Sequence, residues 1–534
     1  MSSPSAAPPR SAPASRATLP AGPELSFPAP DEPEPQLERQ TIAPPIATPT
    51  PRRRHLVVVA NRLPVRRVFD SGDDEPAEDS NPASTTGTGR WERSPGGLVS
   101  ALEPVVRTSR TSWVGWTGSP DEPSAPALEA FEHEGIDLHP VSITAAEQQG
   151  FYEGFSNGTL WPLYHDAIFV PQFHQAWWEA YEAVNRRFAQ QTAAVASPGA
   201  TVWIHDYQLQ LVPKLLRELR PDLQIGFFLH IPFPAQELFL RLPWRAELTE
   251  GLLGADVVGF QTAVGADNFR LVARRVLGAR LDGRHLLHGG RRIRVGTYPA
   301  GIDAARIRAI ATEPATRARA VEIRHELGDP HTVLLGVDRL DYTKGIEVRL
   351  RAFRALLESG RIDPSSTVFV QIAQPSRDEA PGYAETRALV EQMAGAINGD
   401  FGALGGTAVK YLHQGQDLHE LVALYLAADV MLVTPFRDGM NLVAKEYVAA
   451  RVDLDGVLIL SEFAGAAHQM RQAVLVNPFD VRALEAAVDE AVNGDRRQHR
   501  RRMAALGRGV HRDDAAWWAG QFLADLEAVP PVST

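Results

Sequence analysis

Short apolar runs recur along the chain from residue 54 onward, and polar side chains follow most of them directly. Such runs, when helical stretches separate them, predict buried strands that pair in parallel sheets. The first series of predicted strands covers residues 54–62, 200–204, 224–229, 255–260 and 294–298, with a helix at 213–219. We expect this series to form one α/β domain over residues 54–303.

A second series follows a pause near residues 299–303 and a predicted helix at 314–327. Its strands cover residues 331–337, 366–372, 409–412, 430–433 and 456–460. Two such series predict two doubly wound domains that face one cleft, the second over residues 304–505. Ligands of this architecture bind beyond the C-terminal ends of the strands, so polar residues there are the first candidates for a site.

The N-terminal segment has a different composition. The first 51 residues hold 14 of the 41 prolines, and such a segment cannot bury enough apolar surface to offset its ordering entropy. We therefore predict a disordered tail over residues 1–53. The tail lacks the apolar or amphipathic pattern of a targeting peptide, so we expect a cytoplasmic protein.

Composition and charge exclude several classes of function. A formal net charge of −11 offers no basic surface, so we expect no nucleic-acid partner. The absence of cysteine excludes disulfides, thiolate metal sites and cysteine nucleophiles. No apolar run approaches the roughly 18 residues of a membrane-spanning helix, so we expect no membrane partner. Only four of the 54 basic residues are lysine, and two of these, Lys344 and Lys445, lie in motifs.

The segment 434–446 is the most informative motif of the chain. An apolar run leads into a Pro-Phe-Arg-Asp-Gly turn, and a predicted helix begins at Asn441. This arrangement presents backbone N–H groups and a positive dipole end to an anion. Lys445 and Glu446, just inside the helix, favour a ligand with both phosphate and hydroxyl groups, such as a sugar nucleotide. The alternative is an ordinary strand–turn–helix with a solvated Lys–Glu pair.

Other polar residues fall at or near predicted strand ends. They are Arg62, Tyr152, Trp161, Asp206, His230, Arg339, Lys344 and Arg377, together with the Gly96–Gly97 pair before a predicted helix. Each has an ordinary explanation: Asp206 as a helix N-cap, His230 as a core histidine, Arg377 as a surface ion pair, Gly-Gly as a turn. Their coincidence favours one site, in which Arg339 and Lys344 neutralise a departing pyrophosphate.

Several of these stretches carry a family resemblance. They are Val-Val-Ala-Asn-Arg62, Gly96-Gly97-Leu, Phe-Ser-Asn-Gly-Thr-Leu-Trp161-Pro, Trp-Ile-His-Asp206-Tyr, His230-Ile-Pro-Phe-Pro, Arg339-Leu-Asp-Tyr-Thr-Lys344-Gly and Asp438-Gly-Met-Asn-Leu-Val-Ala-Lys-Glu446. From about residue 55 to 525 the chain resembles the trehalose-phosphate synthase family of retaining glycosyltransferases. The resemblance implies two Rossmann-like domains of the GT-B type. It also implies a C-terminal segment at 506–534, with a helix near 517–526, that crosses back to the first domain, and a homo-oligomer (dimer or tetramer).

The resemblance also implies a reaction and roles for residues. Glucose passes with retention from a nucleotide-glucose to glucose 6-phosphate, giving α,α-trehalose 6-phosphate, with no cofactor and no metal. Residues expected at the acceptor are Arg62, Tyr152, Trp161, Asp206 and Arg377. Residues expected at the donor are Gly96, Gly97, His230, Arg339, Lys344, Gln416, Asp438, Gly439, Met440, Asn441, Leu442, Val443, Ala444, Lys445 and Glu446. The expected catalytic residues are His230, Asp206, Arg339, Lys344 and Asp438.

Some alternatives stay open at this point. Gln416 departs from the aromatic residue of the bacterial pattern near the base, so UDP-, ADP- and GDP-glucose remain candidate donors. A related transferase would use another phosphorylated acceptor, such as glycerol 3-phosphate, and a catalytically silent member would act as a regulatory subunit. The Asp453–Val457 stretch resembles an aspartyl-phosphatase motif, but fewer than about 80 residues follow it, too few for that domain. We interpret this stretch as a loop before a strand.

Overall fold

The first sheet gathers the strands of the first half of the chain. The computed structural model describes residues 55–68, 90–93, 102, 111–121, 128–376, 382–403 and 406–529. Within these residues the sheet has ten strands in the order β10-β11-β12-β9-β8-β7-β1-β4-β6-β5. Their bounds are β1 (Leu56–Arg62), β4 (Thr111–Trp116), β5 (Phe131–His133), β6 (Ile136–Pro140), β7 (Thr201–His205), β8 (Gln224–Leu229), β9 (Val257–Phe260), β10 (Arg280–Asp282), β11 (His285–His288) and β12 (Arg291–Thr297). The strands from β12 to β6 pair in parallel, whereas β5, β10 and β11 pair antiparallel at the two edges.

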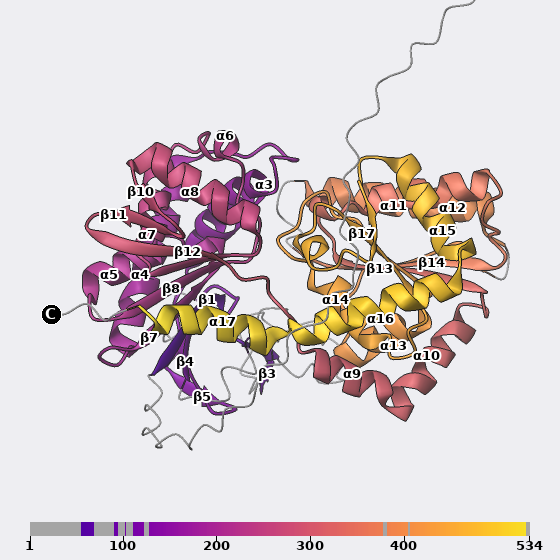
Figure 1. Cartoon of the computed structure of the whole chain (residues 1–534), viewed down its shortest axis with the longest axis horizontal. Helices are drawn as coiled ribbons and strands as arrows, with labels where there is room; N and C mark the ends of the chain where they lie inside the picture. Colours follow the sequence, from indigo (N-terminus) through magenta and orange to yellow (C-terminus); the bar gives the residue numbers. More distant parts are fainter. Residues whose placement is uncertain are drawn as a thin grey trace, which may run out of the picture. The chain divides into compact units, whose positions relative to one another are not determined.

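Helices cover both faces of this sheet, because its central strands are apolar on both sides. Val57 and Val59 of β1 pack with α4 (Gln175–Val195), α5 (Val212–Leu219), α7 (Arg245–Leu253) and α8 (Ala263–Leu277). Val58 and Ala60, which point the other way, pack in the cluster that includes α17 (Ala515–Glu527). Figure 1 shows α17 alongside β7 and β8.

The last helix thus returns to the first sheet. The Phe522 ring stacks on Trp203 of β7, with ring centroids 4.8 Å apart, and Trp518 lies 5.2 Å from the same ring. Tyr298 donates a hydrogen bond from its hydroxyl to Asp525 (2.7 Å). The expected crossing of a C-terminal helix to the first domain is therefore confirmed, with helix bounds at 515–527.

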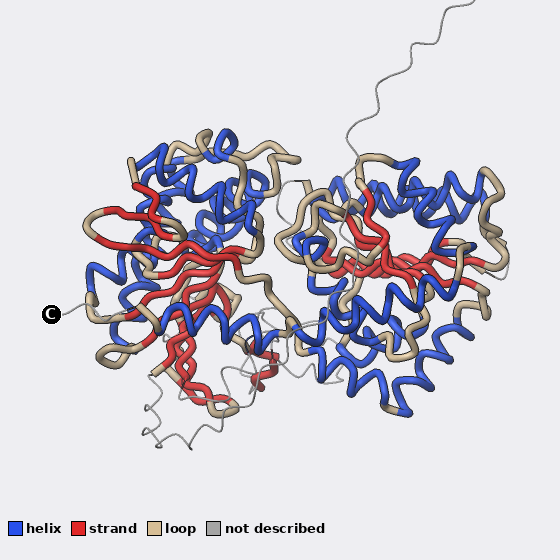
Figure 2. Tube along the Cα trace, in the orientation of Figure 1, coloured by secondary structure: helices blue, strands red, loops and turns tan. Residues whose placement is uncertain are grey.

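The second sheet contains six parallel strands in the described part of the chain. The order is β15-β14-β13-β16-β17-β18. The bounds are β13 (Thr332–Arg339), β14 (Thr367–Gln374), β15 (Val409–Leu412), β16 (Val430–Val433), β17 (Val457–Ser461) and β18 (Val474–Val476). One face carries α9 (Ala304–Thr312), α10 (Pro314–Glu326), α13 (Leu418–Ala427), α14 (Leu442–Ala450) and α16 (Arg496–Arg512), the other α11 (Ile346–Glu358), α12 (Tyr383–Phe401) and α15 (Val481–Asn493). Figure 2 shows the strands of each sheet between layers of helices.

The chain passes between the two sheets twice, and the two connections touch each other. The first connection follows β12 and the second joins α16 to α17. Ala515 donates its N–H to the Ile302 carbonyl (3.0 Å), and Gly301 packs directly against the backbone of Asp514. Residues 53–534 form one compact unit. The predicted domain boundaries themselves stay predictions, and the tail at 1–53 lies outside the described residues.

One region differs from the expected pattern. Tyr152 and Trp161 were predicted at strand ends, but Tyr152 lies in a π-helix, η1 (Gln148–Leu160), and Trp161 begins the following helix α3 (Trp161–Tyr164). The strand-end prediction was wrong because the whole stretch is helical, and its glycines allow it to pack closely against α4. A Cβ at Gly154 would lie 2.5 Å from the Trp177 ring of α4, so only glycine allows this approach. Among the described residues, no helix is long and apolar enough to cross a membrane.

Candidate active site

The second sheet contributes a cation and an anion in direct contact. Lys344 ends the short 3₁₀ turn η3 (Tyr342–Lys344) after β13, and its Nζ donates to Asp438 Oδ2 at 2.6 Å. Asn441 donates its side-chain N–H to the same oxygen (3.2 Å). Burial by itself raises the pKa of Asp438, but the Lys344 ammonium outweighs it and holds that pKa below its usual value. Asp438 is therefore ionised at neutral pH.

A buried arginine fixes the backbone around this pair. Arg349 of α11 is 1% exposed and donates to Asp338 (2.5 Å), Thr434 (2.7 Å) and the Lys344 carbonyl (2.9 Å). It thus ties together the ends of β13 and β16 and the residue that carries the ammonium. Sequence reasoning missed Arg349, because nothing in a helical arginine indicates that it is buried.

The start of α14 has the geometry predicted from the sequence. Asn441 has a left-handed backbone (φ 72°) and caps the helix by accepting a hydrogen bond from the Ala444 N–H (3.2 Å). Met440 is buried, and its carbonyl accepts from the Ala466 N–H (2.8 Å). Leu442 and Val443, which follow in the first turn of the helix, are half-buried.

Gly439 lies between two segments of backbone. A Cβ at this position would be 1.9 Å from the His230 carbonyl oxygen, and one at Gly465 would be 1.9 Å from the Gly439 oxygen. The loop that carries Asp438 is therefore held directly against the end of β8 in the first sheet. The sequence placed His230 and Asp438 near one ligand, and the structure brings their loops together.

Lys445 departs from its predicted role as a donor ligand. Its Nζ is buried and donates to the Ala300 carbonyl (2.6 Å) and to Gln469 Oε1 (2.7 Å), and burial lowers its pKa to about 8. Gln469 in turn donates to Asp513 (3.2 Å). The ammonium thus links the donor motif to both connections between the sheets, and the assignment of this side chain to the ligand is corrected.

Glu446, the next residue, keeps a position compatible with its prediction. Its carboxylate accepts a hydrogen bond from the buried Tyr425 hydroxyl (3.0 Å). Burial raises the pKa of Glu446. Contact with a ribose stays a prediction.

In the first sheet, Asp206 and His230 form a connected pair at adjacent strand ends. Asp206 follows β7 with φ 76° and ψ 170°, a conformation that non-glycine residues rarely adopt. Its Oδ1 accepts the His230 N–H (3.1 Å). Asp206 does stand at the N-cap position of the 3₁₀ turn Tyr207–Leu209, as considered above, but its side chain makes no capping hydrogen bond there. His230 Nε2 lies 3.1 Å from His205 Nδ1. Burial lowers the pKa of His230 to about 3, so its imidazole is neutral at physiological pH.

Arg62, at the end of β1, lies among aromatic rings. Its guanidinium carbon is 4.2 Å from the Trp116 ring centroid and 5.2 Å from that of Tyr152. Gly118, with φ 104°, leaves the space that the guanidinium fills. Trp116 and Gly118 were missed, although an apolar strand before Thr-Gly at 117–118 is the signal that could have found them.

Trp161 joins the first sheet to the second. The Arg339 guanidinium lies over its ring at 5.3 Å, and the Tyr207 ring is 5.7 Å away. His165, 1% exposed, donates from Nδ1 to the Trp161 carbonyl (2.8 Å), and burial lowers its pKa to about 4. The predicted acceptor residue Trp161 and the predicted donor residue Arg339 therefore meet in one place.

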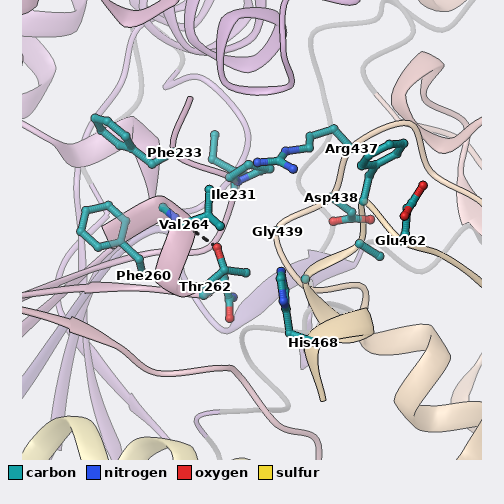
Figure 3. Close-up of a pocket in the computed structure, with 16 residues that line it drawn as sticks. Ile231, Phe233, Phe260, Thr262, Val264, Arg437, Asp438, Gly439, Glu462 and His468 are labelled. Atoms are coloured by element: carbon teal, nitrogen blue, oxygen red, sulfur yellow. Dashed lines mark hydrogen bonds between the residues drawn. The ribbon is translucent and has the colours of Figure 1, made fainter. Parts of the chain in front are cut away.

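A pocket opens beside the Asp438–Gly439 loop (Figure 3). Phe233 and Phe260 line it from the first half of the chain, and Arg437, Glu462 and His468 line it from the second half. Gln416, in the loop between β15 and α13, is half-buried. Gly96, Gly97 and Arg377 lie outside the described residues, so their predicted roles stay predictions.

Comparison with known proteins decides the family. Residues 54–528 match the family model of glycosyltransferase family 20. The chain belongs to this family. A trehalose-6-phosphate synthase of Mycolicibacterium gilvum (strain PYR-GCK) is 52% identical over 497 residues, which cover 91% of this chain and 96% of that protein.

Solved structures agree with the family assignment. A UDP-forming α,α-trehalose-phosphate synthase from Burkholderia xenovorans, in complex with glucose-6-phosphate, has a TM-score of 0.79 at 32% identity and covers 89% of this chain and 100% of its own. A structure described as "Trehalose-6-phosphate from E. coli bound with UDP-2-fluoro glucose" has a TM-score of 0.79 at 33% identity, with 89% and 100% covered. The predicted GT-B fold of this family 20 glycosyltransferase is thereby confirmed.

Proposed function

We propose that this glycosyltransferase makes α,α-trehalose 6-phosphate by transferring glucose, with retention, from a nucleotide-glucose to glucose 6-phosphate. The names of its relatives support the product, and solved relatives are described with glucose-6-phosphate and with UDP-2-fluoro glucose. The observation that carries the proposal is the contact of the Asp438–Gly439 loop with His230. It places the Lys344–Asp438 pair of the second sheet opposite Asp206 and His230 of the first.

The donor is proposed to lie against the second sheet. Arg339 and Lys344 supply positive charge for the diphosphate, and the capped N-terminus of α14 supplies N–H groups. Among the described residues, Asp438 accepts one of the three N–H groups of the Lys344 ammonium, so two are left for a ligand. Asp438, ionised and fixed by Lys344 and Asn441, is suited to accept hydrogen bonds from sugar hydroxyls.

The acceptor is proposed to lie against the first sheet. Arg62 is held by aromatic rings rather than by a carboxylate among its described contacts, so its guanidinium can receive a phosphate dianion. Arg377 is proposed as the second side chain that donates hydrogen bonds to the phosphate of glucose 6-phosphate. Replacing Arg377 with Ala should raise the apparent KM for glucose 6-phosphate far more than the KM for the nucleotide-glucose. Equal effects on the two KM values would contradict this role.

Retention is proposed to occur without a covalent glucosyl-enzyme and without a metal. A double displacement needs a carboxylate poised behind the anomeric carbon. Asp206 and Asp438 are instead occupied by the His230 N–H and by Lys344. The leaving phosphate oxygen, stabilised by Arg339 and Lys344, would accept the proton of the attacking hydroxyl on the same face of the sugar.

The test is product identification with purified protein. The protein is incubated with UDP-, ADP- or GDP-glucose and either glucose 6-phosphate or glycerol 3-phosphate, and the linkage is determined by NMR. We expect α,α-trehalose 6-phosphate, formed equally well with excess chelator. Lys344→Ala should lose most turnover while the fold persists. Product from glycerol 3-phosphate alone, a strict requirement for divalent metal, or a glucosylated aspartate in the mass spectrum would each contradict the proposal.

A further inference from the structure

A buried histidine lies directly behind His230. His205 is the last residue of β7, and His230 follows β8, the neighbouring parallel strand. His205 is 0% exposed, and its Nδ1 is 3.1 Å from His230 Nε2. The two imidazoles therefore share one hydrogen bond, and one ring must donate while the other accepts.

The surroundings of His205 are aromatic. The Trp203 ring lies 4.6 Å from the His205 ring, and Trp518 of α17 lies 5.2 Å from Trp203 and 5.9 Å from His230. Three buried atoms here have no hydrogen-bond partner among the described residues: His205 Nε2, Trp203 Nε1 and Trp518 Nε1. Indole nitrogens only donate, so Trp203 Nε1 and Trp518 Nε1 are already two buried N–H donors without an acceptor among the described residues.

This asymmetry distinguishes the two arrangements of the shared proton. If His230 donated from Nε2, then His205 would carry its own proton on Nε2 and add a third buried N–H without an acceptor. If His205 donates from Nδ1, its Nε2 keeps only a lone pair, and no further buried N–H is left without an acceptor. A buried N–H group without an acceptor is rarer in proteins than a buried acceptor without a donor, so the second arrangement is favoured.

We propose that His205 is a positioning residue that donates from Nδ1 to His230 Nε2 and so keeps the proton of His230 on Nδ1. The role of His230 beside the transferred sugar rests on the proposed function. With the proton on Nδ1, His230 offers a hydrogen-bond donor, and not an acceptor, from that atom to a sugar oxygen. His205 thus sets the direction of a hydrogen bond in the active site without touching the substrate.

The tautomer can be measured without substrate. The full-length protein is labelled with ¹⁵N-histidine, and the His230 signals are assigned by their loss in His230→Gln. We expect a protonated, pyrrole-like Nδ1 and an unprotonated, pyridine-like Nε2 for His230. A protonated Nε2 on His230 would overturn the proposal. If the tautomer is as expected but no trehalose phosphate forms, only the proposed function fails.

Two variants then test the consequence for turnover. His205→Leu removes the N–H that donates to His230. We expect kcat to fall by about tenfold to hundredfold, as when other histidine-orienting partners are removed, and the KM for glucose 6-phosphate to stay unchanged. His205→Asn places an amide N–H near the position of Nδ1 and should recover most of that loss. Wild-type kcat in the Leu variant, or an equal loss in both folded variants, would contradict the proposal. If a variant does not fold, the ¹⁵N measurement of the His230 tautomer in the wild-type protein tests the proposal by itself.

Discussion

The loop of the second sheet that carries Gly439 packs against the end of β8 in the first sheet, and a single added methyl group tests the importance of this contact. Gly439 lies outside the left-handed region, so Gly439→Ala imposes no backbone strain and acts through volume alone. The new Cβ would lie 1.9 Å from the His230 oxygen, whereas ordinary contact begins at 3.4 Å. The two loops must therefore separate by about 1.5 Å, the difference of these two distances.

Such a separation moves Asp438 away from His230, and both face the proposed donor sugar. A misplacement of about 1 Å can reduce a rate about 100-fold, which corresponds to about 2.7 kcal/mol of transition-state stabilisation. We therefore expect Gly439→Ala to lower kcat/KM for the donor at least about 100-fold. Steady-state kinetics with both substrates varied would measure this loss, and circular dichroism would verify the fold.

A matched control separates this effect from glycine replacement in general. Gly399 of α12 has open space where a Cβ would be, so Gly399→Ala should leave the kinetics unchanged. It should also stabilise the helix slightly, by up to about 1 kcal/mol. If Gly439→Ala keeps kcat/KM within about threefold of the wild type, the contact between the loops does not set the geometry of the site.

Three further predictions follow from single residues. Lys445→Met should lower the free energy of unfolding by about 1–3 kcal/mol, because the Ala300 carbonyl loses its hydrogen-bond donor. The KM for the nucleotide-glucose should change little, and a tenfold rise in this KM would show that the lysine side chain binds the ligand. His165 has a pKa of about 4 in the fold against 6.5 when unfolded, so the unfolded state binds more protons between these values and stability falls as pH drops through that window. The wild-type protein should lose more unfolding free energy between pH 6.5 and pH 4 than His165→Gln does, by up to about 3 kcal/mol. An equal loss in the two proteins would contradict the lowered pKa of His165. Gln416 should permit turnover with ADP- or GDP-glucose, and strict selectivity for UDP-glucose would refute this.

The local parts of the fold could be predicted because their causes are local. Buried parallel strands are apolar on both faces, and such runs located β8 and β16 with their observed bounds. Asn441 was predicted to begin a helix, and its side chain caps α14. These features depend on residues within a few positions of one another, and the sequence displays them directly.

Features that depend on distant contacts could not be predicted in this way. Lys445 looked like a ligand because it adjoins a donor motif, but its partner Ala300 is 145 positions away. Arg349 gave no signal, because its contacts arise from burial beside the ends of β13 and β16. The π-helical path of Tyr152 depends on the packing of its neighbours against α4.

The return of α17 to the first sheet has a consequence for how the enzyme is made. Trp518 is 288 positions after His230, which it helps to enclose. At about 5–20 residues per second, a ribosome adds this part of the chain about 15–60 s after His230. During that interval Trp203 and Phe228 have no cover from α17, and the nascent chain presents an aromatic surface to other molecules. We therefore expect chaperones to bind nascent chains that stop before residue 515 far more than complete chains, which ribosome-bound chains of defined length would show.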